Sequence, residues 1–246
     1  MATLVYILIA VVAVSLVSLI GVLYFFFNEK VLSRLMPFLV AFAAGGLLGG
    51  SFFHLIPESF EALDHALASI YIIVGIILFL LFEQTLHWHH EHGHDCKDCK
   101  RDVAGYSILL GDGLHNFLDG VLLASAFMIN VPTGIALTTA ILFHEIPQEL
   151  GDYAVLIKSG FSRVKALFWN LISALMAVIG GVGAFYFLGN FEKIIPDVVA
   201  VGAGGFLYIA LVDLFAELKV GKKWSIKFGE ILSLILGLVV IYFSAG

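Results

Sequence analysis

The sequence predicts an all-α membrane protein with eight transmembrane helices and both termini on the extracellular or periplasmic side. Hydrophobic residues make up 61% of the 246 residues and charged residues only 13%, whereas soluble domains carry about 25% charged residues. The apolar residues occur in long runs, and a transmembrane helix needs about 20 of them. The strands of a membrane β-barrel would instead be short and alternating. A polytopic helical bundle is the fold class that remains.

Eight runs are apolar and long enough to cross a membrane. The first has no basic segment before it and is too long for the core of a signal peptide, so we expect it to be retained as a membrane span. We expect residues 1–246 to form one transmembrane domain. The predicted spans are Ala2–Phe27, Pro37–Ser59, Ala66–Leu86, Val103–Ile129, Thr133–Ile157, Val164–Leu188, Pro196–Leu218 and Ile226–Phe243.

The basic residues predict the orientation of these spans. Twelve of the thirteen Lys and Arg residues fall in or beside the odd-numbered loops, and only Lys193 falls in an even-numbered loop. Cytoplasmic loops are enriched in Lys and Arg, so the odd-numbered loops are expected in the cytoplasm. This alternation would fail if the helix count were wrong by one. Count and orientation therefore support each other.

The fourth and fifth predicted spans carry polar sequences in their middle. These are GDGLHNFLDG at 111–120 and HEIPQELGD at 144–152. A charged side chain at the bilayer centre costs roughly 2.5–3.5 kcal/mol. The five carboxylates together would cost on the order of 12 kcal/mol if each stood alone. Neither sequence contains Lys or Arg, so a bound cation or a proton is the expected compensation.

The polar side chains form one stripe on each helix. At about 100° per residue, the first stripe spans about 100° and the second about 140°. Two such helices facing each other would enclose imidazole, carboxylate and amide groups, which suit Zn²⁺ or another first-row metal better than Mg²⁺ or Ca²⁺. The stripes comprise Asp112, His115, Asn116 and Asp119 in the fourth span and His144, Glu145, Gln148, Glu149 and Asp152 in the fifth.

The depth of these residues points to transport. The two spans centre near Asn116 and Glu145, which places six of the polar residues at the midplane. Asp112 and Asp152 lie about one to two turns nearer the cytoplasm. A midplane site with further ligands on one side is what alternating access requires.

HNFLDG and HEIPQELGD resemble the paired signatures of the ZIP family of divalent-metal transporters, in particular the subfamily whose fifth span reads HExPHExGD. HLIPES at 54–59 and FLYIALVDLFAEL at 206–218 are similar to further family sequences. The resemblance implies a primary metal site at His115, Asp119, His144 and Gln148. It implies a second site at Asn116, Asp119, Glu145 and Gln148. The chain departs from the subfamily at Gln148, where His is usual, and at Ser173, where some members have Glu.

The resemblance also implies import of a divalent metal into the cytosol, with one helix bundle moving against another. Zn²⁺ is the expected substrate, with Cd²⁺, Fe²⁺ and Mn²⁺ as alternatives. His54, one turn from Glu58 near the outer end of the second span, is either an entrance residue or part of a polar interface. Asp112, Glu149 and Asp152 are expected along the rest of the pathway.

Residues 87–102 form a His- and Cys-rich segment in the third loop. CxxC supplies two thiolates at a spacing typical of zinc sites, and the neighbouring histidines supply imidazoles. We expect a cytoplasmic loop that holds or senses metal, the alternative being an inert polar linker. Its candidate ligands are His89, His90, His92, His94, Cys96 and Cys99.

Two other functions remain open from the residues alone. His144-Glu145 begins like the HExxH of a zinc hydrolase, but Gln148 replaces the second histidine. A passive cation channel could use the same carboxylates. We expect a transporter and not an enzyme, with metal ions and lipids as partners and no organic cofactor or nucleic acid. A homodimer is compatible with this interpretation, and the short length favours a prokaryotic plasma (inner) membrane.

Overall fold

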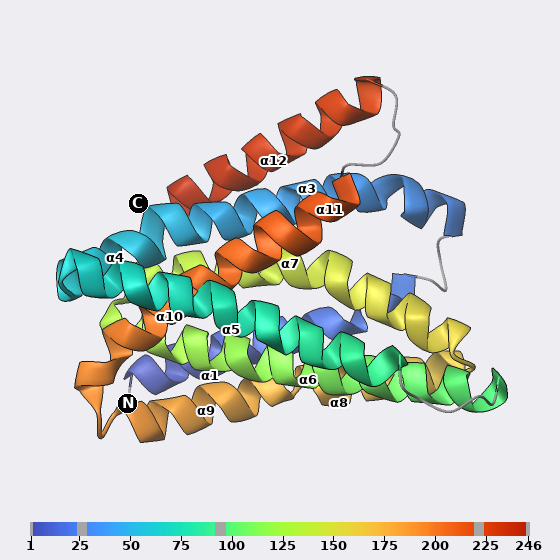
Figure 1. The fold of residues 1–246 in the computed structure, drawn as a ribbon, viewed down its shortest axis with the longest axis horizontal. Coiled ribbons are helices and arrows are strands. Elements are labelled where there is room, and N and C mark those ends of the chain that lie inside the picture. The colour runs from blue at the N-terminus through green and yellow to red at the C-terminus, as the bar shows by residue number, and fades with distance from the viewer. Residues whose placement is uncertain (1, 24–28, 92–96, 219–223, 245–246) are drawn as a thin grey trace.

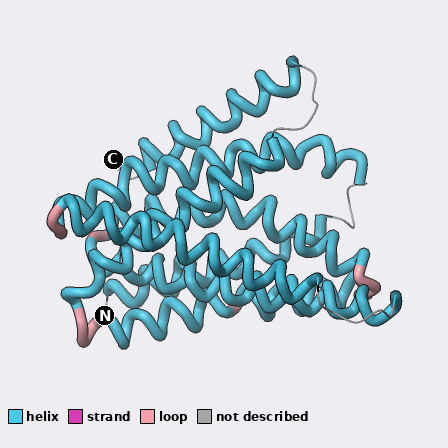
Figure 2. Tube along the Cα trace, in the orientation of Figure 1, coloured by secondary structure: helices cyan, strands magenta, loops and turns pink. Residues whose placement is uncertain are grey.

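A computed structural model of the chain describes residues 2–23, 29–91, 97–218 and 224–244. Within this part, the chain is helical almost throughout and has no strand, as the tube in Figure 2 shows. The elements form eight consecutive rods joined by short connections, which confirms the predicted helical bundle. The rods run along the long axis of the molecule, and both termini lie at the same end of it (Figure 1).

Four of the rods are regular or nearly regular helices. They are α5 (His65–Glu91), α6 (Lys97–Ile129), α7 (Val131–Lys158) and α12 (Trp224–Ser244). The first rod is α1 (Ala2–Val17) followed by the 3₁₀ turn η1 (Ser18–Val22), and the sixth is α8 (Arg163–Ala174) followed by α9 (Met176–Leu188). The short 3₁₀ turn η3 (Glu192–Ile194) leads into the seventh rod.

The second and seventh rods each contain a widened π-helical turn. The second is α3 (Glu29–Gly50), the π turn η2 (Ser51–Leu55) and α4 (Ile56–Ala62). The seventh is α10 (Ile195–Tyr208), the π turn η4 (Ile209–Leu214) and α11 (Phe215–Leu218). The π turn η4 lies within the sequence 206–218, and η2 overlaps the start of the sequence 54–59. Both sequences are similar to ZIP-family sequences, and π turns occur often at functional sites.

Five rods are long and apolar enough to cross a membrane by length and composition, among the residues described. They are Ala2–Val22, Arg34–Ala62, Arg163–Leu188, Ile195–Val212 and Ile226–Ser244. In α5 the apolar part is the shorter stretch His65–Leu81. The other two rods, α6 and α7, have 33 and 28 residues but carry the polar stripes in their interiors. The two rods that carry the polar stripes are therefore not among the five apolar candidates.

Glycines bring the rods together in pairs. A Cβ on Gly45 of α3 would lie 2.1 Å from the carbonyl oxygen of Leu234, and one on Gly237 of α12 would lie 2.2 Å from that of Phe42. The same reciprocal contact joins α5 to α10 and α6 to α9. Small residues allow membrane helices to approach this closely without a hydrophobic driving force. The remaining reciprocal glycines are Gly75 with Gly204 and Gly120 with Gly180.

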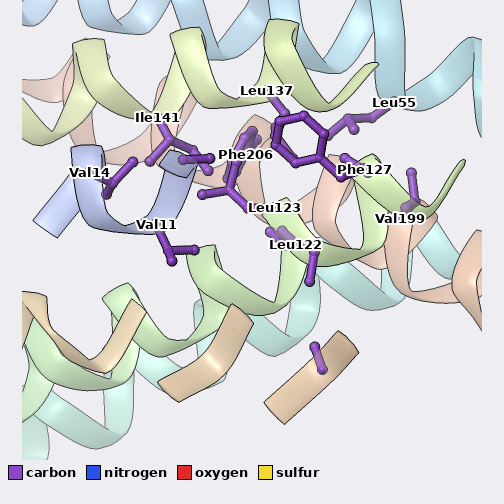
Figure 3. Close-up of a cluster of buried hydrophobic side chains, with 14 of the residues drawn as sticks. Val11, Val14, Leu55, Leu122, Leu123, Phe127, Leu137, Ile141, Val199 and Phe206 are labelled. Atoms are coloured by element: carbon purple, nitrogen blue, oxygen red, sulfur yellow. The ribbon is translucent and has the colours of Figure 1, made fainter. Parts of the chain in front are cut away.

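The apolar core lies between the polar stripes and the end of the molecule that holds the termini. In Figure 3 its side chains converge around Phe206 of α10. Leu123 follows the first stripe in α6, and Ile141 precedes the second stripe in α7, so both lie on the terminus side of the polar residues. The labelled members are Val11, Val14, Leu55, Leu122, Leu123, Phe127, Leu137, Ile141, Val199 and Phe206.

Candidate metal centre

The turn between α6 and α7 sets which of their residues meet. Only Asn130 separates the two helices, and its side-chain oxygen accepts a hydrogen bond from the backbone N–H of Thr133 at 2.7 Å. His115 lies 15 residues before Asn130, and His144 lies 14 residues after it. At 1.5 Å per residue, both reach the same depth, about 21 Å from the turn. The hairpin therefore brings the two polar stripes together.

Four side chains from these stripes converge, and we call His115, Asp119, His144 and Glu145 the histidine quartet. Nε2 of His144 lies 3.2 Å from Oδ2 of Asp119, 3.2 Å from Oε1 of Glu145 and 3.2 Å from Nε2 of His115. Nε2 of His115 lies 3.6 Å from Oδ2 of Asp119 and 3.5 Å from Oε1 of Glu145. All four ligand atoms lie within 4.8 Å of one another.

These separations fit a tetrahedral metal ion. Zinc binds imidazole nitrogen and carboxylate oxygen at about 2.0–2.2 Å, and a regular tetrahedron with such bonds places its ligand atoms about 3.3–3.6 Å apart. Five separations between the quartet atoms run from 3.2 to 3.6 Å. Two N–H groups cannot point at each other across 3.2 Å, so at least one of the facing imidazole nitrogens presents a lone pair. The quartet therefore has the shape of a ligand shell.

The tautomer of His144 supports this arrangement. Its Nδ1 lies 3.3 Å from the backbone carbonyl oxygen of Ala140, one turn earlier in α7. A carbonyl oxygen only accepts hydrogen bonds, so the proton of the neutral ring is on Nδ1 and the lone pair of Nε2 faces the quartet. Metal-binding histidines are commonly oriented in this way. The ring of Phe206 packs edge-on against His144, with centroids 5.9 Å apart.

The carboxylates of the quartet are buried without regular hydrogen-bond donors. Asp119 and Glu145 are both 0% exposed. Neither oxygen of either group accepts a hydrogen bond of regular geometry from the residues described. A buried carboxylate costs several kcal/mol unless a charge or donors compensate it. A divalent ion among these atoms would supply that compensation.

A second group of acidic residues adjoins the quartet on the side away from the chain termini. Ligand atoms of Asp112, Glu145 and Glu149 lie within 4.8 Å of one another. The carboxylate of Asp112 accepts hydrogen bonds at Oδ1 from Asn116 Nδ2 at 2.9 Å and from Gln148 Nε2 at 3.4 Å. Its Oδ2 accepts one from Ser173 Oγ at 2.5 Å. Asp112 is therefore held in a fixed orientation.

The amide residues expected as metal ligands lie beside the quartet and face Asp112. Asn116 is fully buried and directs its Nδ2 to Asp112, and its Oδ1 is buried with no donor among the residues described. Gln148 is half-buried and directs its Nε2 to the same carboxylate. Of the six expected ligands, four form the quartet and these two amide residues lie beside it.

The other expected pathway residues have different surroundings. Glu149 is buried in the acidic group, and Asp152 is half-buried close to Asp112. His54 faces α12 instead, with Nε2 3.3 Å from the carbonyl oxygen of Ile241. Of the proposed loop ligands, His92, His94 and Cys96 lie outside the described residues, as do the side chains of His89, His90 and Cys99.

The sequence interpretation missed Asn170 of α8. This side chain is 0% exposed and its Nδ2 donates to Oε2 of Glu149. Ser173, which contacts Asp112, lies three residues later and so on the same face of α8. An asparagine within the apolar run 166–179 was the available signal, because buried polar residues in a membrane helix face the bundle interior.

Comparison with known proteins decides the family. Residues 3–98 and 87–245 match the profile of the family described as ZIP Zinc transporter, which covers nearly the whole chain. This chain belongs to the ZIP family. It is an integral membrane protein of a family of transporters and not of enzymes, so the hydrolase interpretation of His144-Glu145 is set aside.

Several zinc transporters are similar to this ZIP-family chain. It is 33% identical over 218 residues to ZIP13 of Pongo abelii, covering 82% of this chain and 65% of the relative. It is 30% identical over 268 residues to zipt-7.1 of Caenorhabditis briggsae, covering 85% and 68%. It is 39% identical over 144 residues to human ZIP10, covering 53% of this chain and 17% of the relative. The chain therefore spans less than two thirds of the length of ZIP13 and under a fifth of that of ZIP10.

Proposed function

We propose that this chain transports divalent metal ions across the membrane, with Zn²⁺ as the principal substrate and the histidine quartet as the site that binds it in transit. The observation that carries the proposal is the set of separations between the quartet atoms, 3.2–3.6 Å, in a buried position. Two imidazoles and two carboxylates favour Zn²⁺ or Cd²⁺, while Fe²⁺ and Mn²⁺ tolerate the same ligands.

In this proposal the residues around the quartet have separate roles. His115, Asp119, His144 and Glu145 bind the ion directly, and the free Oδ1 of Asn116 is a further ligand. Gln148 orients Asp112 through its amide and lies at the edge of the site. His54 remains an expected entrance residue. The His- and Cys-rich segment 87–102 is an accessory to one transport domain, residues 1–246.

Import into the cytosol is the proposed direction. Of the basic side chains described, Lys30, Arg34, Arg163, Lys165 and Lys227 begin rods at the end opposite the termini, and Lys193 lies at the terminus end. The positive-inside rule places the first end in the cytoplasm. The plasma membrane and a homodimer stay predictions. The relatives described above come from animals and give no support to a prokaryotic source.

Uptake by purified protein in liposomes tests the proposal. Asp119→Ala and His144→Ala each remove a charged or coordinating group from the quartet, so we expect uptake of radiolabelled ⁶⁵Zn²⁺ to fall to the level of empty liposomes. Ser125→Ala is the matched control in α6, because among the residues described this buried hydroxyl donates only to the carbonyl of Val121 in its own helix. It should transport normally.

Two outcomes would contradict the proposal. Normal uptake by both quartet variants would remove the site assignment. Ion-channel conductance in planar bilayers, without saturation of uptake, would replace the carrier with a passive cation channel. A carrier shows slow uptake that saturates with metal concentration.

A further inference from the structure

Next to the histidine quartet lies a cluster of oxygen atoms, and three of its four residues have no metal-binding role in the proposed transport site. We call Asp112, Glu145, Glu149 and Asn170 the oxygen cluster. Glu149 follows Glu145 by one turn of α7, and Asn170 approaches from α8. The cluster therefore joins three helices at the cytoplasmic side of the quartet in the proposed orientation. It shares one member, Glu145, with the quartet.

The oxygen cluster contains buried acceptors that lack donors. Glu149 is 0% exposed, and its Oε1 has no hydrogen-bond partner among the residues described. Its other oxygen accepts from Nδ2 of Asn170, and the Oδ1 of that same amide is buried without a donor. Unsatisfied buried polar groups cost about 1–3 kcal/mol each, and more when charged. The open acceptors of Glu149 and Asn170 indicate a missing positive partner.

The chain supplies no basic residue for this role from the two polar helices. No Lys or Arg occurs between positions 102 and 157, which covers nearly all of α6 and α7. Asp112, by contrast, has donors on both oxygens from Asn116, Gln148 and Ser173. A carboxylate oxygen that accepts a hydrogen bond still has a lone pair with which to bind a metal ion.

We propose that the oxygen cluster is a second divalent-cation site, built from the carboxylates of Asp112, Glu145 and Glu149 and the amide oxygen of Asn170. Its ligand atoms are oxygens only, so it favours harder ions such as Mn²⁺ over Zn²⁺ compared with the quartet. The shared carboxylate of Glu145 lets an ion keep one ligand as it passes between the two sites. This inference deepens the proposed transport function, but binding at the cluster does not depend on transport.

Mn²⁺ binding to the purified full-length chain in detergent tests the proposal. The variant His115→Ala/His144→Ala removes both imidazoles, and we expect it to bind one Mn²⁺ per chain, measured by loss of the electron paramagnetic resonance signal of free Mn²⁺. Adding Glu149→Gln should weaken this binding by at least about tenfold, as loss of a ligand or of its immediate support does. Unchanged Mn²⁺ affinity after Glu149→Gln would overturn the proposal.

Matched variants separate binding from folding. Glu58→Gln makes the same chemical change in α4, outside the cluster. There Glu58 accepts hydrogen bonds from Asn130 and Thr133 at the start of α7. It should leave Mn²⁺ binding unchanged. Asn170→Leu should weaken Mn²⁺ binding, whereas Asn170→Asp, which keeps an oxygen, should preserve it. Equal binding by Asn170→Leu and Asn170→Asp would contradict the assignment of this amide.

Zinc binding distinguishes failure of this proposal from failure of the transport proposal. Glu149→Gln alone should retain one Zn²⁺ at the quartet in calorimetry, which also shows that the variant is folded. Suppose that wild-type protein in liposomes moves no metal, whereas the Glu149→Gln substitution abolishes Mn²⁺ binding. The transport proposal then fails and the second site stands. If transport is normal and Glu149→Gln leaves Mn²⁺ binding unchanged, only the second site fails.

Discussion

Gln148 occupies the position at which histidine is usual in the ZIP subfamily with the HExPHExGD signature. Its contacts explain how a glutamine fits there. Its Nε2 donates to Oδ1 of Asp112 at 3.4 Å. Asp112 is also held by Asn116 and Ser173, so three neutral donors surround one carboxylate. The four ligand atoms of the quartet are complete without Gln148. Gln148 therefore helps to orient Asp112, and the quartet keeps two imidazoles.

Replacing Gln148 with His should change metal preference. Gln148→His adds an imidazole at the edge of the quartet and removes a donor from Asp112. Nitrogen ligands favour Zn²⁺ and Cd²⁺ over Mn²⁺, so these ions should compete more strongly against Mn²⁺ uptake, by roughly tenfold as for other changes near a metal. Competition assays in liposomes measure the shift. Identical competition profiles for zinc, cadmium, iron and manganese would refute it.

The sequence predicted part of this site because one turn fixes it. His115 and His144 lie at nearly equal distances from Asn130, so a helical hairpin places them at the same depth. The directions of the Asn116 and Gln148 amides depend on side-chain rotamers, which spacing does not determine. The contact of Asn170 with Glu149 depends on how α8 packs against α7, and the sequence contains no local signal for that pairing. Metal binding by these residues stays a prediction.

At the scale of helices, paired glycines allow three pairs of rods to lie in backbone contact. A Cβ on Gly204 would lie 2.0 Å from the carbonyl oxygen of Ile72, and one on Gly75 would lie 2.0 Å from that of Val201. Backbones in such contact leave no room for a methyl group on either side. The same geometry holds α6 against α9 at Gly120 and Gly180. Since α6 carries half of the quartet, this contact also fixes the position of His115 and Asp119.

Gly204→Ala should therefore destabilise the bundle. The added methyl group forces α5 and α10 apart, and overpacking of this kind costs about 1–3 kcal/mol. Thermal unfolding in detergent, followed by size-exclusion chromatography, measures the effect. Gly183→Ala is the control, because in the described part of the chain its Cβ would meet no atom within 4 Å beyond its chain neighbours and its own helix backbone, and alanine should be neutral or stabilising there. Equal melting temperatures for the two variants would contradict the role of the glycine pair.

The sequence predicted the number and order of the helices but not their irregularities. Long apolar runs identify a membrane helix without showing where its hydrogen bonding changes. The π turns at Ser51–Leu55 and Ile209–Leu214 and the break at Leu175 were not predicted. The carbonyl of Ala174, beside that break, accepts a hydrogen bond from Ser15 Oγ at 2.8 Å. Such irregularities depend on partners in other helices, which a sequence pattern does not contain.

At the scale of the whole molecule, charge and topology agree. Rods of alternating direction bring the starts of α3, α8 and α12 to one end, and the described basic side chains there are Lys30, Arg34, Arg163, Lys165 and Lys227. The terminus end carries Asp64 and the connection at Lys193. The membrane orientation that follows from this asymmetry can be measured directly.

Cysteine labelling tests this orientation. In a Cys96→Ser/Cys99→Ser background, Glu61→Cys places a thiol at an exposed position at the terminus end, and Ser162→Cys places one at an exposed position at the other end. A membrane-impermeant maleimide should label Glu61→Cys in intact cells and Ser162→Cys only after permeabilisation. The reverse pattern would invert the proposed direction of transport.

The quartet contains two carboxylates and two imidazoles, and imidazoles bind metals as neutral ligands. A divalent ion there would bring the sum of charges over ion and ligands to zero. A membrane potential does work of about 2.3 kcal/mol per elementary charge per 100 mV on a charge that crosses the whole membrane, and none on a neutral assembly. Quartets that hold an ion would therefore cross the membrane field with almost no sensitivity to voltage.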